Sequence, residues 1–434
     1  MKLKTLFKIA VLLAAAAVVL SCDWNPIFYR VSQEVEPTEA RIQGSPTNMV
    51  VFERNGRKVM FVASGRTLHW YFGDEEYGPV WGDSAYGVPQ PAEAGGRIIS
   101  LAVTENFFYA LVMRDTADGI ASDLKRIGAA DSAWTTINSG YTIQAVFADP
   151  EQSVLFASSR ISGNSYRILH LNDNASGSAF SVLQIPGFDN VRMLTGIAYF
   201  NDTFYLSTAG TGIFSVNFSA NNSAPVAVQM SIVGGAAPSS ETPFNRTFPG
   251  LITLPEPFPT VVAVDRSGIL YGLIDDRNAS SLNDDNEDPP PPYRFNALTI
   301  GEGENVSVIS LGNISSGALS IWRCADNIAR ILLAGIETRA YIFGYVEFDI
   351  GNGALSQRQV PGRVHPAAAN RVHSSVDNEG RFISTLGTHP VGHLLQTPFD
   401  VDPAMTSFAS TQNSGLWSYR HRGVPRQWQW NAEE

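Results

Sequence analysis

The sequence predicts an all-β fold, a single seven-bladed β-propeller that follows an N-terminal lipoprotein signal peptide. Three observations predict this fold. Short apolar or alternating runs are bounded by Gly, Asn, Asp or Pro, and hardly any stretch sustains the helical period of about 3.6 residues. One hairpin pattern recurs along the chain at about the interval of a propeller blade. An apolar run near the N-terminus has the features of an export signal.

Composition limits the class of protein. The chain has 434 residues, of which 44% are hydrophobic and 16% are charged, so it has enough apolar surface to fold and too little charge for general disorder. This length is compatible with one large all-β domain. The formal net charge is −11, whereas binding to nucleic acid needs clustered Lys and Arg. We therefore expect no nucleic-acid partner.

The first 22 residues have the parts of a bacterial lipoprotein signal. A basic stub, MKLKTLFK, precedes an apolar run from Ile9 to Leu20, which is shorter than the roughly 20 residues that span a bilayer as a helix. The tetrapeptide that ends in Cys22 resembles a lipobox. We expect residues 1–21 to be removed and Cys22 to carry lipid; a plain cleaved signal and a buried N-terminal helix are the alternatives. The protein would then lie in the cell envelope, anchored to a membrane, on the periplasmic side or at the cell surface.

The repeated hairpin consists of a strand, a turn rich in Asp, Asn or Gly, and a second strand that ends in small residues. Asn55-Gly56, Ser267-Gly268 and Glu379-Gly380 supply the positive φ that tight turns need. Successive copies begin 44 to 65 residues apart, and a four-stranded blade occupies roughly 40 to 50 residues. We interpret each hairpin as the inner strand pair of a blade. The copies begin at Val50, Leu101, Ala145, Gly196, Val261, Ile321 and Ser374.

Third and fourth strands are expected after each hairpin. The segments 212–216 (GIFSV) and 415–419 (GLWSY) are near copies, and each is predicted to be a third strand whose glycine turns the chain. Residues 65–71 are a looser version. Small residues near the second strand, Ala63, Ser158, Ser207 and Gly272, would lie where the blades converge. The fourth strands would contain Trp81, Trp134, Trp428 and Trp430, which we interpret as core between blades, with an exposed sugar platform as the alternative.

A propeller must close, because an open ring leaves a bare sheet edge. The alternating run from Ile27 to Val35 precedes the first hairpin and is predicted to pair near the C-terminal blade. We therefore divide the chain into a signal peptide (1–21), a lipid anchor, tether and closing strand (22–47), and the seven-bladed propeller (48–434).

The signal, the segment IFYRVSQEVEP, the repeated hairpins and the terminal GLWSYR together resemble β-propeller lipoproteins of host-associated treponemes and related spirochaetes. The resemblance would span the mature chain, but its motifs are structural. It implies a propeller lipoprotein of the cell envelope and carries no catalytic residues to this sequence.

Cysteines and histidines give weak indications of chemistry. If Cys22 carries lipid, Cys324 has no partner for an internal disulfide, and we expect a buried small side chain rather than a catalytic thiol. A window of four histidines includes a pair with zinc-like spacing, yet Pro390 and Gly392 oppose the helix that would align them, so no metal site is assigned. The four are His365, His373, His389 and His393.

An acidic segment, followed by four prolines, is the candidate partner loop. It contains Asp284, Asp285, Glu287 and Asp288 and would be an insertion in the fifth blade. Calcium binding is the alternative, although the usual Asp-x-Asp-x-Asp-Gly spacing is absent. Ala130 to Trp134 resembles part of the Asp-box turn of sialidase-like propellers, but it occurs once and lacks the usual serine before and glycine after.

No recognisable catalytic or cofactor-binding set emerges, so we expect no cofactor. The first functional hypothesis is a membrane-anchored binding or scaffold protein that holds another protein or a glycan. The alternative is a propeller hydrolase that acts on carbohydrates or lactones at the central channel, with several carboxylates and an Arg or His converging there.

Overall fold

The structure, a computed structural model, contains strands and turns in the residues it describes, with no helix among them. An all-β fold was predicted and is confirmed. The described part of the chain has no helix long and apolar enough to cross a membrane. The described residues are 42–74, 78–82, 86–93, 95–117, 119–137, 139–174, 179–218, 225–233, 247–254, 260–265, 269–275, 293–297, 299–300, 307–308, 316–323, 329–335, 343–349, 356–357, 391–397, 407–422 and 427–433.

Several predictions concern other parts of the chain. Six of the sequence-based predictions lie outside the described residues. They concern the cysteine expected to carry lipid, the expected closing strand, the second cysteine, three of the clustered histidines, the acidic candidate loop and the last hairpin. In chain order these are Cys22, Ile27–Val35, Asp284 to Asp288, Cys324, His365, His373, the hairpin from Ser374, and His389.

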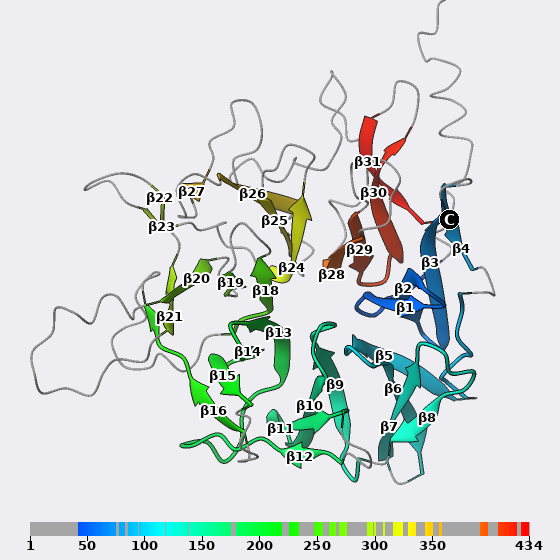
Figure 1. Cartoon of the computed structure of the whole chain (residues 1–434), viewed down its shortest axis with the longest axis horizontal. Helices are drawn as coiled ribbons and strands as arrows, with labels where there is room; N and C mark the ends of the chain where they lie inside the picture. The colour runs from blue at the N-terminus through cyan, green and yellow to red at the C-terminus, as the bar shows by residue number, and fades with distance from the viewer. Residues whose placement is uncertain are drawn as a thin grey trace, which may run out of the picture. The chain divides into compact units, whose positions relative to one another are not determined.

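Six sheets have four strands each, and within each sheet every strand pairs antiparallel with the next in the chain (Figure 1). The first three sheets are formed by β1 (Val50–Arg54), β2 (Arg57–Ser64), β3 (Thr67–Asp74) and β4 (Gly78–Trp81); by β5 (Gly96–Val103), β6 (Phe107–Thr116), β7 (Gly119–Gly128) and β8 (Thr135–Ile137); and by β9 (Ile143–Ala148), β10 (Val154–Ser162), β11 (Ser165–Asn172) and β12 (Ser181–Val182).

The other three four-stranded sheets come later in the chain. They are formed by β13 (Leu194–Phe200), β14 (Thr203–Thr208), β15 (Ile213–Asn217) and β16 (Val226–Gln229); by β24 (Ser316–Arg323), β25 (Ala329–Gly335), β26 (Phe343–Asp349) and β27 (Ser356–Gln357); and by β28 (Val391–Gln396), β29 (Ser407–Thr411), β30 (Leu416–Arg422) and β31 (Gln427–Ala432).

A five-stranded sheet lies between the fourth and the later four-stranded sheets in the chain. Its outermost strand, β17, pairs parallel with β21, and a two-stranded sheet of β22 and β23 follows. These strands are β17 (Ile232–Val233), β18 (Gly250–Leu254), β19 (Thr260–Val264), β20 (Leu270–Asp275), β21 (Tyr293–Ala297), β22 (Thr299–Ile300) and β23 (Ser307–Val308).

One of the predicted inner hairpins is wrong. The hairpin from Val261 forms β19 and β20, which are the second and third strands of their sheet because β18 precedes them. The hairpin from Ser374 lies outside the described residues, and the first two strands of the last described sheet are β28 and β29. The physical reason is that any two successive strands of an antiparallel meander share the same turn chemistry, so turn residues alone do not tell which pair is innermost.

The predicted third strands are confirmed. Residues 213–217 form β15 and residues 416–422 form β30, each the third strand of its sheet, and residues 67–74 form β3. Gly212 and Gly415, just before β15 and β30, have φ of 87° and 77°, which glycine adopts without strain. Trp81 ends β4, whereas Trp134 immediately precedes β8 rather than lying on it. Trp428 and Trp430 lie on β31.

Successive sheets contact one another through their first strands. The contacts join β1 to β5, β5 to β9, β9 to β13, β13 to β18, β18 to β24 and β24 to β28. The last sheet then returns to the segment before β1, since Leu416 N donates to Ile42 O at 3.0 Å and Ser410 Oγ donates to Pro46 O at 2.6 Å. Repeated meanders joined in this order, with the last joined to the first, are the architecture of a β-propeller.

Apolar side chains fill the spaces between neighbouring sheets. Between the first and second sheets, Phe61 and Phe108 are fully buried with ring centroids 4.7 Å apart. Between the last and first sheets, Tyr71 packs edge-on against Phe408 with centroids 5.0 Å apart. Trp81 packs against this second cluster, and Trp134 packs against the first. These two tryptophans therefore belong to the core between sheets, as predicted.

Small polar side chains fasten the sheets where they converge. Ser158, which is fully buried on β10, accepts a hydrogen bond from Leu194 N at the start of β13, at 2.9 Å. Ser100 on β5 bonds the backbone of Val146 on β9 through its hydroxyl group. Ala63 and Ser207 are also buried in second strands, as predicted, whereas Gly272 lies in the third strand of its sheet.

Candidate ligand-binding pocket

The innermost strands carry mainly apolar and small side chains. On β1, β5, β9, β13, β18, β24 and β28, Glu53 is the only carboxylate. Hydrolysis of a glycosidic bond commonly uses two carboxylates. These described strands alone therefore do not supply the paired acids that the hydrolase hypothesis requires.

His393 is the one clustered histidine among the described residues. It lies on β28, opposite Ser410 of β29. Within the described part of the chain, no three His, Cys, Asp or Glu residues come together in a group that could hold a metal ion.

The turn that resembles an Asp box is a structural joint. Asp131 lies between β7 and β8, and its Oδ2 accepts a hydrogen bond from Gly128 N at 2.8 Å. Arg54, at the end of β1, is 8% exposed and donates to the carbonyls of Gly128, Ala129 and Asp131 at 2.7 to 2.9 Å. The planar guanidinium thus connects the first sheet to this turn of the second sheet.

Asp173 forms a second polar joint at the end of β11. It is 7% exposed, and its carboxylate accepts hydrogen bonds from Thr104 Oγ1, Asn106 Nδ2 and Tyr109 Oη at 2.5, 2.9 and 2.9 Å. Burial, reinforced by the negative charge of Asp173, raises the pKa of Tyr109 far above its usual value. With three donors, this carboxylate is satisfied within the fold and fastens the second sheet to the third.

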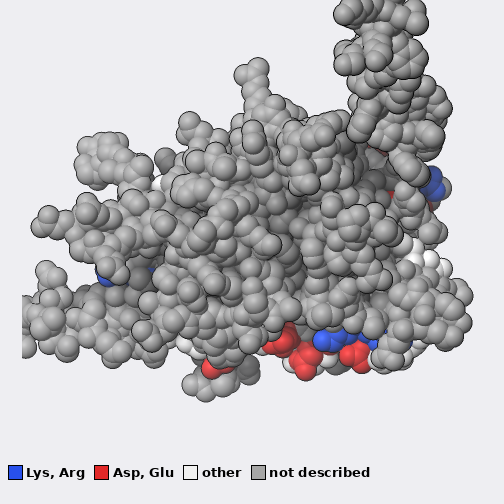
Figure 2. Space-filling view, turned by 90° about the horizontal axis from the view of Figure 1, so that it is seen from above, with Lys and Arg blue, Asp and Glu red and all other residues white. Residues whose placement is uncertain are grey.

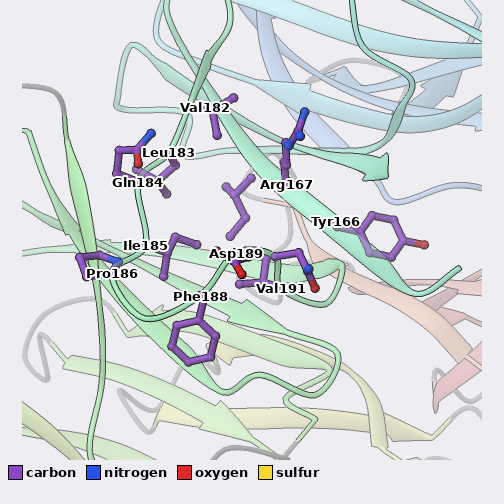
Figure 3. A pocket seen from close by; sticks show the side chains of 12 residues that line it. Tyr166, Arg167, Val182, Leu183, Gln184, Ile185, Pro186, Phe188, Asp189 and Val191 are labelled. Carbon is purple, nitrogen blue, oxygen red and sulfur yellow. The ribbon is translucent and has the colours of Figure 1, made fainter. Parts of the chain in front are cut away.

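A third group of polar side chains lies at the mouth of a pocket and does not join two sheets. After β12, residues 183–191 leave the outer edge of β11 and then return to it, because Leu183 N donates to Ile168 O and Val191 exchanges two hydrogen bonds with Tyr166. The loop also reaches the fourth sheet, where Gln184 O accepts from Ala227 N of β16 at 2.8 Å. A pocket of about 280 Å³ lies between this loop and β11 (Figure 3).

The floor of the pocket is apolar. Ile168, Leu183 and Val191 are at most 3% exposed. The Phe188 ring packs against Phe214 of β15 with centroids 5.5 Å apart at 88°. These contacts fix the loop, and with it the wall of the pocket, on the core between the third and fourth sheets.

The mouth of the pocket is polar. Gln184, Asp189 and Asn190 line it and are exposed. Their side chains make no hydrogen bond to any residue that the structure describes, unlike the carboxylates of Asp131 and Asp173. Figure 3 shows the Arg167 side chain directed away from Asp189. The Asp189 carboxylate therefore contributes a negative charge that no described residue pairs with.

Half-buried His170 lies two residues along β11 from Ile168 on the same face of the strand. Its ring centroid lies 5.5 Å from that of Phe218, and its Nδ1 is buried without a hydrogen-bond partner in the described residues. Burial lowers the pKa of His170 below its usual value. The imidazole is therefore neutral at pH 7 and adds no positive charge near the pocket.

The sequence analysis did not identify this pocket. The available signal was Ile185-Pro186-Gly187-Phe188, in which Pro favours the second and Gly the third position of a type II turn. Gly187 has φ of 84°, and Phe188 N donates to Ile185 O at 3.0 Å. The signal predicts a turn, whereas the cavity behind the turn depends on contacts with β11 and β16.

Charges elsewhere are mixed. Where described residues reach the face seen in Figure 2, Asp and Glu side chains lie beside Lys and Arg.

No family model matches the sequence, and no curated protein is similar to it. Among solved structures, the chain is similar to a GH74 enzyme of Niastella koreensis, with 12% identity, a TM-score of 0.44, and coverage of 87% of this chain and 43% of that chain. It is also similar to the WD40 β-propeller domain of Doa1, with 7% identity, a TM-score of 0.44, and coverage of 88% and 95%. A third similar structure is a mitotic checkpoint complex, with 12% identity, a TM-score of 0.48, and coverage of 89% and 96%.

The chain spans less than half the length of the Niastella koreensis enzyme. These similarities are too distant to indicate function. The propeller assignment depends on the strand pairing and on the contacts between sheets in this chain.

Proposed function

We propose that this chain is a membrane-anchored binding protein of the cell envelope, which holds another protein or a glycan on a rigid propeller. One observation carries the proposal: the polar groups of Asp173 and Ser158, which join neighbouring sheets, are hydrogen-bonded within the fold, whereas those at the mouth of the pocket are not bonded to any described residue. Satisfied polar joints rigidify a fold, and unpaired polar groups beside a preformed cavity are available to a ligand.

The proposed propeller has seven blades. The five-stranded sheet counts as one blade, with β18 innermost and β17 added outside β21. Together with the six four-stranded sheets it would complete a ring of seven blades. The two-stranded sheet of β22 and β23 would then belong to a connection between blades.

The proposed anchor is a lipid on Cys22 after removal of residues 1–21, as the lipobox-like tetrapeptide indicates. This would tether the propeller outside the cytoplasm, as in the treponeme lipoproteins that the sequence resembles. The acidic segment from Asp284 to Asp288 remains a candidate loop for a protein partner.

Fatty-acid labelling in cells tests the anchor. We expect the full chain to incorporate a labelled fatty acid and to fractionate with membranes, and Cys22→Ser to do neither. Cys324→Ser is the matched control and should behave as the unmodified protein. Labelling of the Cys22→Ser variant would exclude this anchor.

Affinity capture from detergent-solubilised envelope, combined with a glycan array, tests the binding role. We expect a stoichiometric protein partner or a reproducible glycan signal. If neither is found, the chain is not the binding protein proposed here.

A further inference from the structure

We propose that the pocket between β11 and the loop 183–191 binds one uncharged sugar ring, which is either a terminal or an internal unit of an oligosaccharide. This inference rests on the proposed binding function and names the ligand class and the place of binding. The site would lie at the outer rim, between the third and fourth sheets.

Size limits the ligand first. Pockets for drug-sized ligands measure roughly 300 to 1,000 Å³, and this pocket measures about 280 Å³. It therefore suits a ligand of the size of one sugar ring better than an extended peptide. A peptide would also need an open strand edge, whereas β11 is bonded here at Ile168 by Leu183 and at Tyr166 by Val191.

The distribution of polar groups also favours a sugar. A sugar ring presents hydroxyl groups around its rim and C–H groups on its faces. The carboxylate of Asp189 accepts hydrogen bonds, whereas the amides of Gln184 and Asn190 both donate and accept, so together they match hydroxyl groups that do both. Half-buried Ile185, which lines the pocket, supplies apolar surface for the C–H faces.

Charge excludes the anionic sugars. Asp189 and Arg167 both line the pocket, and Figure 3 shows the Arg167 side chain directed away from Asp189. A carboxylate or phosphate on the ligand that lies beside Asp189 would be repelled by its negative charge. We therefore expect neutral sugars to bind and uronic acids, sialic acids and sugar phosphates to bind less well.

Ligand-observed NMR on the full chain tests the inference, with a panel of neutral hexoses, N-acetylhexosamines and their short oligomers, the acidic sugars, and a mixture of short peptides. We expect saturation transfer from the protein to at least one neutral sugar. Asp189→Ala should weaken its binding about tenfold or more, as loss of a hydrogen bond to a charged group does, and Asn190→Ala should weaken it less.

The matched control is Asp115→Ala, which removes an exposed aspartate from β6 in the second sheet, away from the pocket. It should leave sugar binding unchanged. Phe188→Ala would not distinguish a lost sugar contact from a displaced loop, because it also removes the contact with Phe214.

Three outcomes would overturn the inference: no neutral sugar binds, a sugar binds equally well to the Asp189→Ala variant, or only peptides bind in a way that depends on Asp189. If affinity capture recovers a partner whose binding is insensitive to Asp189→Ala, the proposed binding function stands while the pocket inference fails. If neither sugars nor partners bind, both fail.

Discussion

The side chain of Asn48 pairs with the backbone of Leu101 as a neighbouring strand would. Its Nδ2 donates to Leu101 O at 2.6 Å, and its Oδ1 accepts from Leu101 N at 2.9 Å. Asn48 precedes β1, and Leu101 lies on β5, the innermost strand of the next sheet. One amide thus satisfies both backbone groups of a residue that is 1% exposed, and it joins the first two sheets.

Asn48→Ala should destabilise the fold strongly, because it leaves a buried N–H and a buried C=O without partners. We expect the free energy of unfolding to fall by about 2 to 4 kcal/mol, measured by urea denaturation with tryptophan fluorescence. The exposed turn residue Asn164 gives the control, and Asn164→Ala should change stability by less than about 0.5 kcal/mol. Equal effects of the two substitutions would show that the hydrogen bonds between the Asn48 amide and Leu101 do not stabilise the contact between the first two sheets.

Arg54 should not be replaceable by lysine. Its guanidinium donates to the carbonyls of Gly128, Ala129 and Asp131, and a single ammonium group cannot reproduce that planar arrangement. Arg54→Lys should lower the free energy of unfolding by about 2 kcal/mol or more, whereas Arg97→Lys at an exposed position should have almost no effect. Wild-type stability of the Arg54→Lys variant would contradict this role.

Much of the architecture could be predicted because the turns and strands of a meander have recognisable residue patterns. Gly212 and Gly415 turn the chain just before β15 and β30, and they indicated where these strands begin. The buried small residues Ala63, Ser158 and Ser207 indicated second strands. These signals are local. They follow from φ and from side-chain size at single positions.

The order of strands within the five-stranded sheet could not be predicted, because the identity of the innermost strand depends on its neighbours in space. β18 is innermost because it contacts β13 and β24, and no residue type on β18 encodes that. The pocket could not be predicted either, because it also depends on contacts between residues that are distant in the sequence. The turn at Gly187 is visible in the sequence, but the cavity arises only when Gln184 O bonds Ala227 N of another sheet.

The junction of the last and first sheets should show energetic coupling between Trp81 and Glu433. Trp81 Nε1 donates to Glu433 Oε2 at 2.9 Å, and Glu433 is 2% exposed. A double-mutant cycle of Trp81→Phe and Glu433→Ala should give a coupling energy of about 1 to 2 kcal/mol. Trp134→Phe is the matched control, because Trp134 Nε1 donates to Pro89 O instead, and its effect should add to that of Glu433→Ala. Additivity in the first cycle would mean that this hydrogen bond does not contribute to ring closure.

Acid should weaken the fold through His170. Burial holds the pKa of His170 below the usual 6.5, so the unfolded chain binds a proton at a higher pH than the folded chain does. His170 therefore lowers the free energy of unfolding as the pH falls through about 6.5 towards the folded pKa. His170→Gln removes this titration. We expect the stability difference, wild type minus variant, to be larger at pH 7.5 than at pH 5, measured by urea denaturation at both values. A difference independent of pH would show that the folded and unfolded chains bind this proton equally.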